Sequence, residues 1–249
     1  MRDLNTEHGD SAERKYAYQF DYLMHDYMMQ TFRPFITGQK ALELGCYKGE
    51  FTKRLSESFS SVTVVEGSGQ LIGEARNNVT RPNVKFLHGT FEGIELNERF
   101  EAIFLIHTLE HLDDPGTVLK RIENWLAPQG RLFLAVPNAN AASRQIAVKM
   151  GLIPYNSAVT EGEYSHGHRR TYSLDTLENE VRGAGLSVLG RGGILFKPLA
   201  NFQFDQALEA GIVGQDYLDG CYRLGMTYPD LCASIYLVCT IGRSRSNSA

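Results

Sequence analysis

Five short apolar runs, separated by segments with helical spacing, begin near residue 40 and constrain the fold more than any other feature of the sequence. The run Ile103–Ile106 is apolar at every position, as is typical of a strand buried on both faces of a parallel sheet. Strands are predicted at Ala41–Leu44, Val62–Val65, Val84–Leu87, Ala102–Ile106 and Arg131–Val136, with helices between them at 49–58, 69–78 and 115–126. This alternation predicts an α/β fold: a Rossmann-like, seven-stranded, mostly parallel sheet flanked by helices, with N-terminal helices and lid inserts.

Two inserts interrupt the pattern in the second half of the chain. After Pro137 it breaks for about thirty residues, longer than an ordinary connection, so we expect a functional insert at about 138–172. A second insert, irregular or helical, is expected at about 197–229. The remaining elements are predicted as a helix at Leu174–Ala184 and strands at Leu186–Leu189 and Ala233–Thr240.

The two ends of the chain differ from its middle. Aromatic and apolar residues at three- and four-residue spacing between 12 and 34 predict one or two amphipathic helices. We therefore expect a helical lid segment at 1–37, a main domain at 38–242 and a disordered tail at 243–249.

Composition excludes several classes of function. The net charge of −4 provides no basic field for nucleic acid. No window approaches the ~18 apolar residues of a membrane span, and the charged start lacks the apolar region of a signal peptide. The four cysteines, at 46, 221, 232 and 239, form no CxxC pair and are too sparse for a disulfide scaffold. We expect a cytoplasmic globular protein without a nucleic-acid or membrane partner.

The first predicted strand runs into a turn with glycines at Gly45 and Gly49, and a helix follows. Small residues at such a turn let the backbone approach a ligand, and the helix N-terminus supplies free N–H groups. The turn is neither the dinucleotide motif G-x-G-x-x-G nor a P-loop, and the missing third glycine disfavours a nicotinamide dehydrogenase. Many α/β domains have such a turn, so it identifies no function by itself.

Polar residues follow the other strands where each one ends. Glu66 follows the second strand, and an acidic side chain at that place can accept both hydroxyls of a ribose. The third strand ends at Gly89, Thr90 and Phe91, where backbone groups and an aromatic ring would flank an adenine. The fourth ends at Ile106 and His107. Because open α/β sheets bind ligands at the carboxyl ends of their strands, these segments predict one nucleoside site.

Four segments in order resemble class I S-adenosylmethionine-dependent methyltransferases, and most of all the ubiquinone- and menaquinone-biosynthesis type. They are E-x-G-x-x-x-G, V-V-E-G-S, H-x-L-E-H-L-x-D-P and L-A-P-x-G-R-L-x-L-x-V-P-N, within residues 38 to 137, with a weaker similarity through 190. The resemblance implies that Glu43, Gly45 and Gly49 shape the methionine pocket, that Glu66 holds the ribose, and that Thr90 and Phe91 border the adenine. Further cofactor contacts are expected at Cys46, Tyr47, Gly67, Ser68, Gly89, Ile106, His107, His111 and Tyr22.

Methyl transfer to a hydroxyl requires that the acceptor's proton be removed, and histidine is the usual acid–base group near neutral pH. His166 and His168, in the insert that commonly covers the acceptor in this fold, are the first candidates for a general base, and His107 is the third. The neighbouring Arg169, Arg170 and Tyr172 are predicted to bind the acceptor, the arginines through an anionic group. The alternative is a polar loop whose charges face water.

His107, Glu110 and His111 have the spacing of an inverted zinc-peptidase motif if they are helical. His107 belongs to a strand end, however, so the three side chains need not converge. Some quinone-biosynthesis relatives are metal-assisted and carry Glu at the position of His107. We therefore predict a site without a metal, in which Glu110 caps the next helix.

These observations predict an S-adenosylmethionine-dependent methyltransferase that acts on a small molecule, with a hydroxyl as the first-choice acceptor. Transfer to nitrogen or carbon of a small molecule or nucleotide sugar is the alternative, and a non-catalytic cofactor-binding protein is a third. The chain lacks the Asn/Asp-Pro-Pro-Tyr/Phe tetrad of amino-methylating enzymes that act on nucleic acids or proteins. The insert at 197–229 is predicted to be a substrate lid or the contact of a homodimer.

Overall fold

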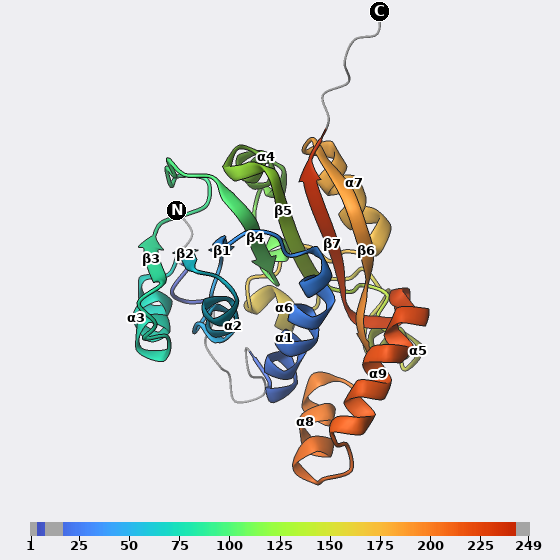
Figure 1. Cartoon of the computed structure of the whole chain (residues 1–249). Coiled ribbons are helices and arrows are strands. Elements are labelled where there is room, and N and C mark those ends of the chain that lie inside the picture. The colour runs from blue at the N-terminus through green and yellow to red at the C-terminus, as the bar shows by residue number, and fades with distance from the viewer. Residues whose placement is uncertain (1–3, 8–16, 243–249) are drawn as a thin grey trace, which may run out of the picture.

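The computed structural model describes residues 4–7 and 17–242, and Figure 1 shows one twisted sheet with helices on both of its faces. The sheet has seven strands in the order β3-β2-β1-β4-β5-β7-β6. Their bounds are β1 Lys40–Leu44, β2 Ser61–Glu66, β3 Val84–His88, β4 Phe100–Ile106, β5 Leu126–Pro137, β6 Leu186–Phe196 and β7 Cys232–Ile241. Strand β7 is antiparallel to both of its neighbours, so β6 again runs in the direction of β5. The predicted Rossmann-like fold is confirmed.

The helices connect the strands and cover the sheet. They are α1 Gln19–Phe32, α2 Glu50–Ser58, α3 Gly69–Asn78, α4 Pro115–Trp125, α5 Ala142–Lys149, α6 Glu161–Ser165, α7 Leu174–Gly183, α8 Asn201–Glu209 and α9 Gln215–Thr227. A short 3-10 turn, Leu109–His111, follows β4. The predicted helices at 49–58, 69–78 and 115–126 agree with α2, α3 and α4 to within a residue.

Alternate residues of the central strands enter two cores, one on each face of the sheet. On one face, Phe104 of β4 stacks on Phe133 of β5 at 4.7 Å between ring centroids, and Phe32 of α1 packs against Phe133 at 5.3 Å. Helices α1, α2, α8 and α9 contribute to this core, and α4 and α7 contribute to the core on the other face. Because the central strands are buried on both sides, most of their residues are apolar, which is the pattern that predicted them.

Two strands, β5 and β6, are much longer than the sequence predicts, whereas the others differ from their predicted bounds by one or two residues at an end. Strand β5 begins at Leu126, because Leu126 pairs with Phe100 before an irregularity in the ladder. Strand β6 continues past Leu189 to Phe196 through three glycines, since β7 pairs with it along this length. A Cβ at Gly192 would lie 2.8 Å from the ring of Tyr236, so the glycine makes room for an aromatic side chain on the neighbouring strand.

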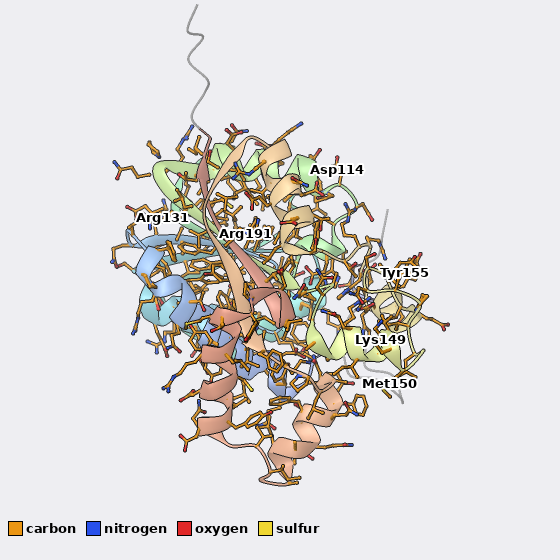
Figure 2. The ribbon with its side chains drawn as sticks, turned by 90° about the vertical axis from the view of Figure 1, so that its right-hand side faces the viewer. Asp114, Arg131, Lys149, Met150, Tyr155 and Arg191 are labelled. Carbon is orange, nitrogen blue, oxygen red and sulfur yellow. The ribbon has the colours of Figure 1, made fainter. Side chains whose placement is uncertain are left out.

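The inserts carry their own helices. Helices α5 and α6 lie within 138–172, and α8 and α9 lie within 197–229. Figure 2 shows Lys149, Met150 and Tyr155 at the outer rim of the first insert, away from the sheet. In the predicted N-terminal lid segment the structure describes α1 and a short 3-10 helix, Arg33–Phe35. Residues 8–16 and the predicted tail at 243–249 lie outside the described residues. No helix in the part of the chain that the structure describes is long and apolar enough to span a membrane.

Gly45, directly after β1, allows a test of this architecture. Its φ of 80° is left-handed, and a Cβ would lie 2.7 Å from Oγ1 of Thr108, so we expect Gly45→Ala to lower the free energy of unfolding by at least ~1–2 kcal/mol. In Gly73→Ala, the matched control, the new Cβ meets no atom within 4 Å and lies within α3, so stability should rise by up to ~1 kcal/mol. Urea titration measures both changes. Equal stabilities would contradict the turn geometry.

Candidate functional site

A cavity of about 1090 Å³ lies where the carboxyl ends of the parallel strands meet. Helix α1 and residues of the 138–172 insert contribute to its wall. The structure brings most of the predicted cofactor contacts into its lining: Tyr22, Glu43, Gly45, Cys46, Tyr47, Glu66, Gly67, Thr90, Phe91, Ile106, His107 and His111. Three of the predicted contacts are not in the lining and lie in the turns behind it: Gly49, Ser68 and Gly89.

The turn after β1 forms one wall of the cavity. Gly45 donates its N–H to the carbonyl of Val65 on β2, and Gly49 donates to the carbonyl of Cys46 before α2 begins. Tyr47 has a left-handed φ of 48°, which is unusual for a residue with a side chain. Burial raises the pKa of the Cys46 thiol, so this cysteine is a small lining residue and no nucleophile.

The carboxylate of Glu66 is fixed between two loops. Its Oε2 accepts a hydrogen bond from Cys46 N at 3.1 Å, and its Oε1 accepts one from Ser68 N at 2.9 Å. Ser68 itself caps α3 by accepting from Leu71 N. A carboxylate has about four lone-pair positions, so each oxygen of Glu66 can accept one more hydrogen bond from a ligand in the cavity.

Glu43 is a second carboxyl group in the lining and is only 1% exposed. Thr52 donates its hydroxyl to Glu43 Oε2 at 2.6 Å. Burial, with a smaller contribution from the charge of Glu66, raises the pKa of Glu43 to about 8. Glu43 is therefore mostly protonated near neutral pH and can also donate a hydrogen bond.

His107 stands at the tip of β4 with a left-handed φ of 47° and faces the cavity. Its Nε2 is 2.8 Å from Oγ of Ser234, at the start of β7. Removal from water, together with nearby His168, lowers the pKa of His107 to about 4, so the imidazole is neutral at physiological pH. A neutral imidazole held by a hydroxyl can accept a proton from a bound acceptor.

Glu110, His111 and His168 form a group of possible metal ligands. Their ligand atoms lie within 4.8 Å of one another, and the rings of the two histidines meet edge to face at 4.6 Å. Glu110 is 1% exposed, and neither of its carboxylate oxygens has a hydrogen-bond partner among the described residues. One carboxylate and two imidazoles are ligand types that suit a divalent cation. The inverted zinc motif is not formed, because His107 turns to Ser234 and His168 takes the third place.

The predicted catalytic and acceptor residues of the 138–172 insert separate into two groups. His166 and His168 line the cavity. Arg169 pairs with Glu7 at 3.1 Å and Asp113 at 3.2 Å, and Arg170 donates to the carbonyls of Leu112 and Asp113. Tyr172 is 3% exposed and bridges to the backbone of Asn138. The described contacts therefore tie Arg169, Arg170 and Tyr172 to the protein framework, and they do not support the prediction that these residues bind the acceptor.

The sequence interpretation missed several polar residues of the lining. His25, on α1, has a buried Nδ1 without a partner among the described residues, and burial lowers its pKa to about 3. Lys197 follows β6, and Ser234 lies at the start of β7. The direction of β6 would have identified Lys197, because a strand parallel to β5 ends at the same edge of the sheet. No pattern in the sequence predicted that His25 would line the cavity.

Comparison with known proteins agrees with this geometry. Residues 16–190 match a family model described as a methyltransferase domain. A mitochondrial ubiquinone biosynthesis O-methyltransferase of Schizosaccharomyces pombe is 23% identical over 186 residues, covering 70% of this chain and 65% of the relative. The enzyme of that name from Aeromonas salmonicida is 24% identical over 178 residues, covering 66% and 69%. The matches thus span about two thirds of these relatives, and they confirm the resemblance found in the sequence.

Solved structures share the fold at low identity. The N-methyltransferase NodS of Bradyrhizobium japonicum, in complex with S-adenosyl-L-homocysteine, has a TM-score of 0.58 at 15% identity and covers 91% of this chain and 89% of its own. A possible histamine N-methyltransferase of Thermotoga maritima has a TM-score of 0.59 at 18% identity and covers 88% and 91%. The strand order of this chain is that of a Rossmann-like sheet, and the family model covers well over half of the chain. The chain therefore belongs to the methyltransferase domain family.

Proposed function

We propose that this protein transfers the methyl group of S-adenosylmethionine to a hydroxyl of a small molecule. The observation that carries the proposal is the carboxylate of Glu66, which two backbone N–H groups fix at the tip of β2 beside a large cavity. A carboxylate held in this way can accept both hydroxyls of a ribose. The O-methyltransferases among the relatives support a hydroxyl acceptor.

The size of the cavity supports a small acceptor. Pockets for one drug-sized ligand measure roughly 300–1,000 Å³, and this cavity, at about 1090 Å³, has room for a nucleoside cofactor and a second small molecule. The net charge of −4 favours such an acceptor over nucleic acid. The four cysteines, all free thiols in the structure, support the prediction of a reducing compartment such as the cytoplasm.

When bound, S-adenosylmethionine supplies an electrophilic methyl group on a sulfonium sulfur. In such a transfer the sulfur–methyl bond would break as the oxygen–carbon bond forms, leaving S-adenosylhomocysteine. Residues around the acceptor would position its oxygen and take up its proton. Of the three candidate bases, His107 fits best, because it stands at the tip of β4, faces the cavity and is oriented by Ser234. His168 packs against His111, and His166 ends α6, so both are assigned to the wall around the acceptor.

The Glu66 assignment is tested by binding. Glu66→Gln keeps the shape of the side chain but replaces one acceptor oxygen with a donor, so we expect affinity for S-adenosylhomocysteine to fall by about ten- to a hundredfold. Titration calorimetry measures it, and thermal melting confirms that the variant is folded. Glu95→Gln, at an 82% exposed side chain, is the matched control and should bind normally. Undiminished binding by Glu66→Gln would remove the main support for the proposal.

The assignment of the base is tested by turnover and its pH dependence. His107→Asn should lower kcat by about 10²–10⁴-fold and leave affinity for S-adenosylhomocysteine within a few-fold of wild type. A base must be neutral to accept a proton, and the pKa of His107 is lowered to about 4, so wild-type activity should be lost only as the pH falls towards 4. His166→Ala and His168→Ala should retain more activity. Loss of most turnover in His166→Ala or His168→Ala, with turnover retained in His107→Asn, would contradict this order.

We further propose that transfer needs no metal, although Glu110, His111 and His168 would suit a cation. The position of His107 supports this proposal, because it stands where metal-assisted relatives carry Glu but contacts Ser234 and is not among the three possible ligands. The expected result is unchanged turnover after dialysis against EDTA. Loss of turnover that zinc or magnesium restores would assign this group as a metal site.

We propose that the second insert forms the contact of a homodimer. Apart from Leu189, every strongly exposed large apolar side chain among the described residues lies on one of the two inserts, and Ile212 and Met226 are 78% and 62% exposed. Such apolar surface is typical of a protein interface. Light scattering should give a dimer for wild type and a monomer for Ile212→Asp combined with Met226→Asp. Leu189→Asp should stay dimeric, and a monomeric wild type at micromolar concentration would exclude the contact.

A further inference from the structure

Lys197 is a buried cation at the end of the cavity opposite Glu66. It directly follows β6, is 4% exposed and belongs to the lining. Along the sheet edge the lining residues stand in the order Thr90 after β3, Glu66 at the end of β2, His107 after β4 and Lys197 after β6. If Glu66 holds the ribose and His107 marks the reacting centre, Lys197 lies on the acceptor's side.

The ammonium group of Lys197 is held by α1 and α8. It donates a hydrogen bond to Oδ1 of Asn201 and lies 4.6 Å from the ring centroid of Phe20. Asn201 in turn donates from Nδ2 to Oδ1 of Asp21 at 2.9 Å. Asn201 therefore bridges a buried cation and a carboxylate, and all three side chains line the cavity.

Two carboxylates already balance this cation. Asp21 accepts from Tyr18 N at 2.8 Å, and Asp205 accepts from Gln19 N and Phe20 N at 2.9 Å each. The charges of Asp21 and Asp205 both act on Lys197. An anionic ligand group would bring a third negative charge to one buried cation, which is costly away from water.

A hydroxyl group matches this arrangement, because it can accept from the Lys197 ammonium and donate to the Asp21 carboxylate. We propose that Lys197, Asp21 and Asn201 form an acceptor subsite that binds an uncharged hydroxyl, as on a sugar or a polyphenol, in preference to a carboxylate. This inference rests on the proposed function and specifies its substrate class: a polyhydroxylated, uncharged small molecule, with one hydroxyl held here and another presented to the reacting centre.

The competing explanation is that the cluster only fastens α1 to α8. In that case substitutions would change stability without changing which small molecules bind. Saturation-transfer NMR on protein loaded with S-adenosylhomocysteine separates the two explanations. The probes are two matched pairs, catechol with 3,4-dihydroxybenzoate and glucose with glucuronate, since the members of each pair differ chiefly by a carboxylate.

We expect at least one neutral probe to bind wild type more tightly than its acidic counterpart. Asp21→Asn and Lys197→Met should each weaken that probe by about tenfold or more, since each removes a hydrogen bond to a charged group. Asp26→Asn, on the same helix, and Lys149→Met, at the outer rim, are the matched controls and should bind as wild type does. Thermal melting identifies folded variants, and Asp21→Asn provides the test if Lys197→Met does not fold.

Three outcomes would overturn the subsite: preference for the acidic probes, unchanged binding in the folded variants, or no binding by any of the four probes. Failure of the wild type to bind S-adenosylhomocysteine is a different result. It would overturn the proposed function itself, and calorimetry before the NMR measurement detects it. The two failures are therefore distinguishable.

Discussion

The hydrogen bonds that fix the carboxylate of Glu66 are the constraint on which the proposed site depends. One oxygen accepts from the turn after β1 and the other from the loop after β2, so a single side chain joins two neighbouring strand ends. The turn after β1 can approach Glu66 because Gly45 has a left-handed φ and no side chain. A carboxylate held in advance loses little conformational freedom when a ligand binds, which favours affinity.

The order of strands then determines which side chains lie next to one another along the cavity. Parallel strands end at one edge of the sheet, so residues far apart in sequence stand side by side there. Glu66 and Thr90 lie towards β3, His107 at the centre, and Lys197 towards β6. The inserts lie on the β5–β6 side and supply the wall around the proposed acceptor. Variation of such inserts on a constant sheet is how one fold serves many substrates.

The sequence predicted the sheet and much of the lining of the cavity at its edge, because both depend on local patterns. Buried parallel strands are continuous apolar runs, and residues after them must fall at the ligand-binding edge, which identified Glu66 and His107. The length of the glycine-rich strand β6 was underestimated, since the strand continues only because β7 pairs with it.

The rest of the proposed site was harder to predict, because the direction of its side chains depends on tertiary contacts. Arginine is typical of anion-binding sites, but Arg169 forms ion pairs with Glu7 and Asp113, which come from distant segments of the chain. His107 has the spacing of a metal ligand, but a hydroxyl on β7 turns it away from Glu110. Lys197 is an unremarkable lysine in the sequence, and only the packing of α1 and α8 over the cavity buries it.

A crystal structure of the complex with S-adenosylhomocysteine tests the central claim most directly. We predict that both ribose hydroxyls lie about 2.6–3.2 Å from the carboxylate oxygens of Glu66, with the adenine beside Phe91 and the sulfur towards His107. A nucleoside bound elsewhere, or a ribose whose hydroxyls face another part of the cavity, would contradict the account.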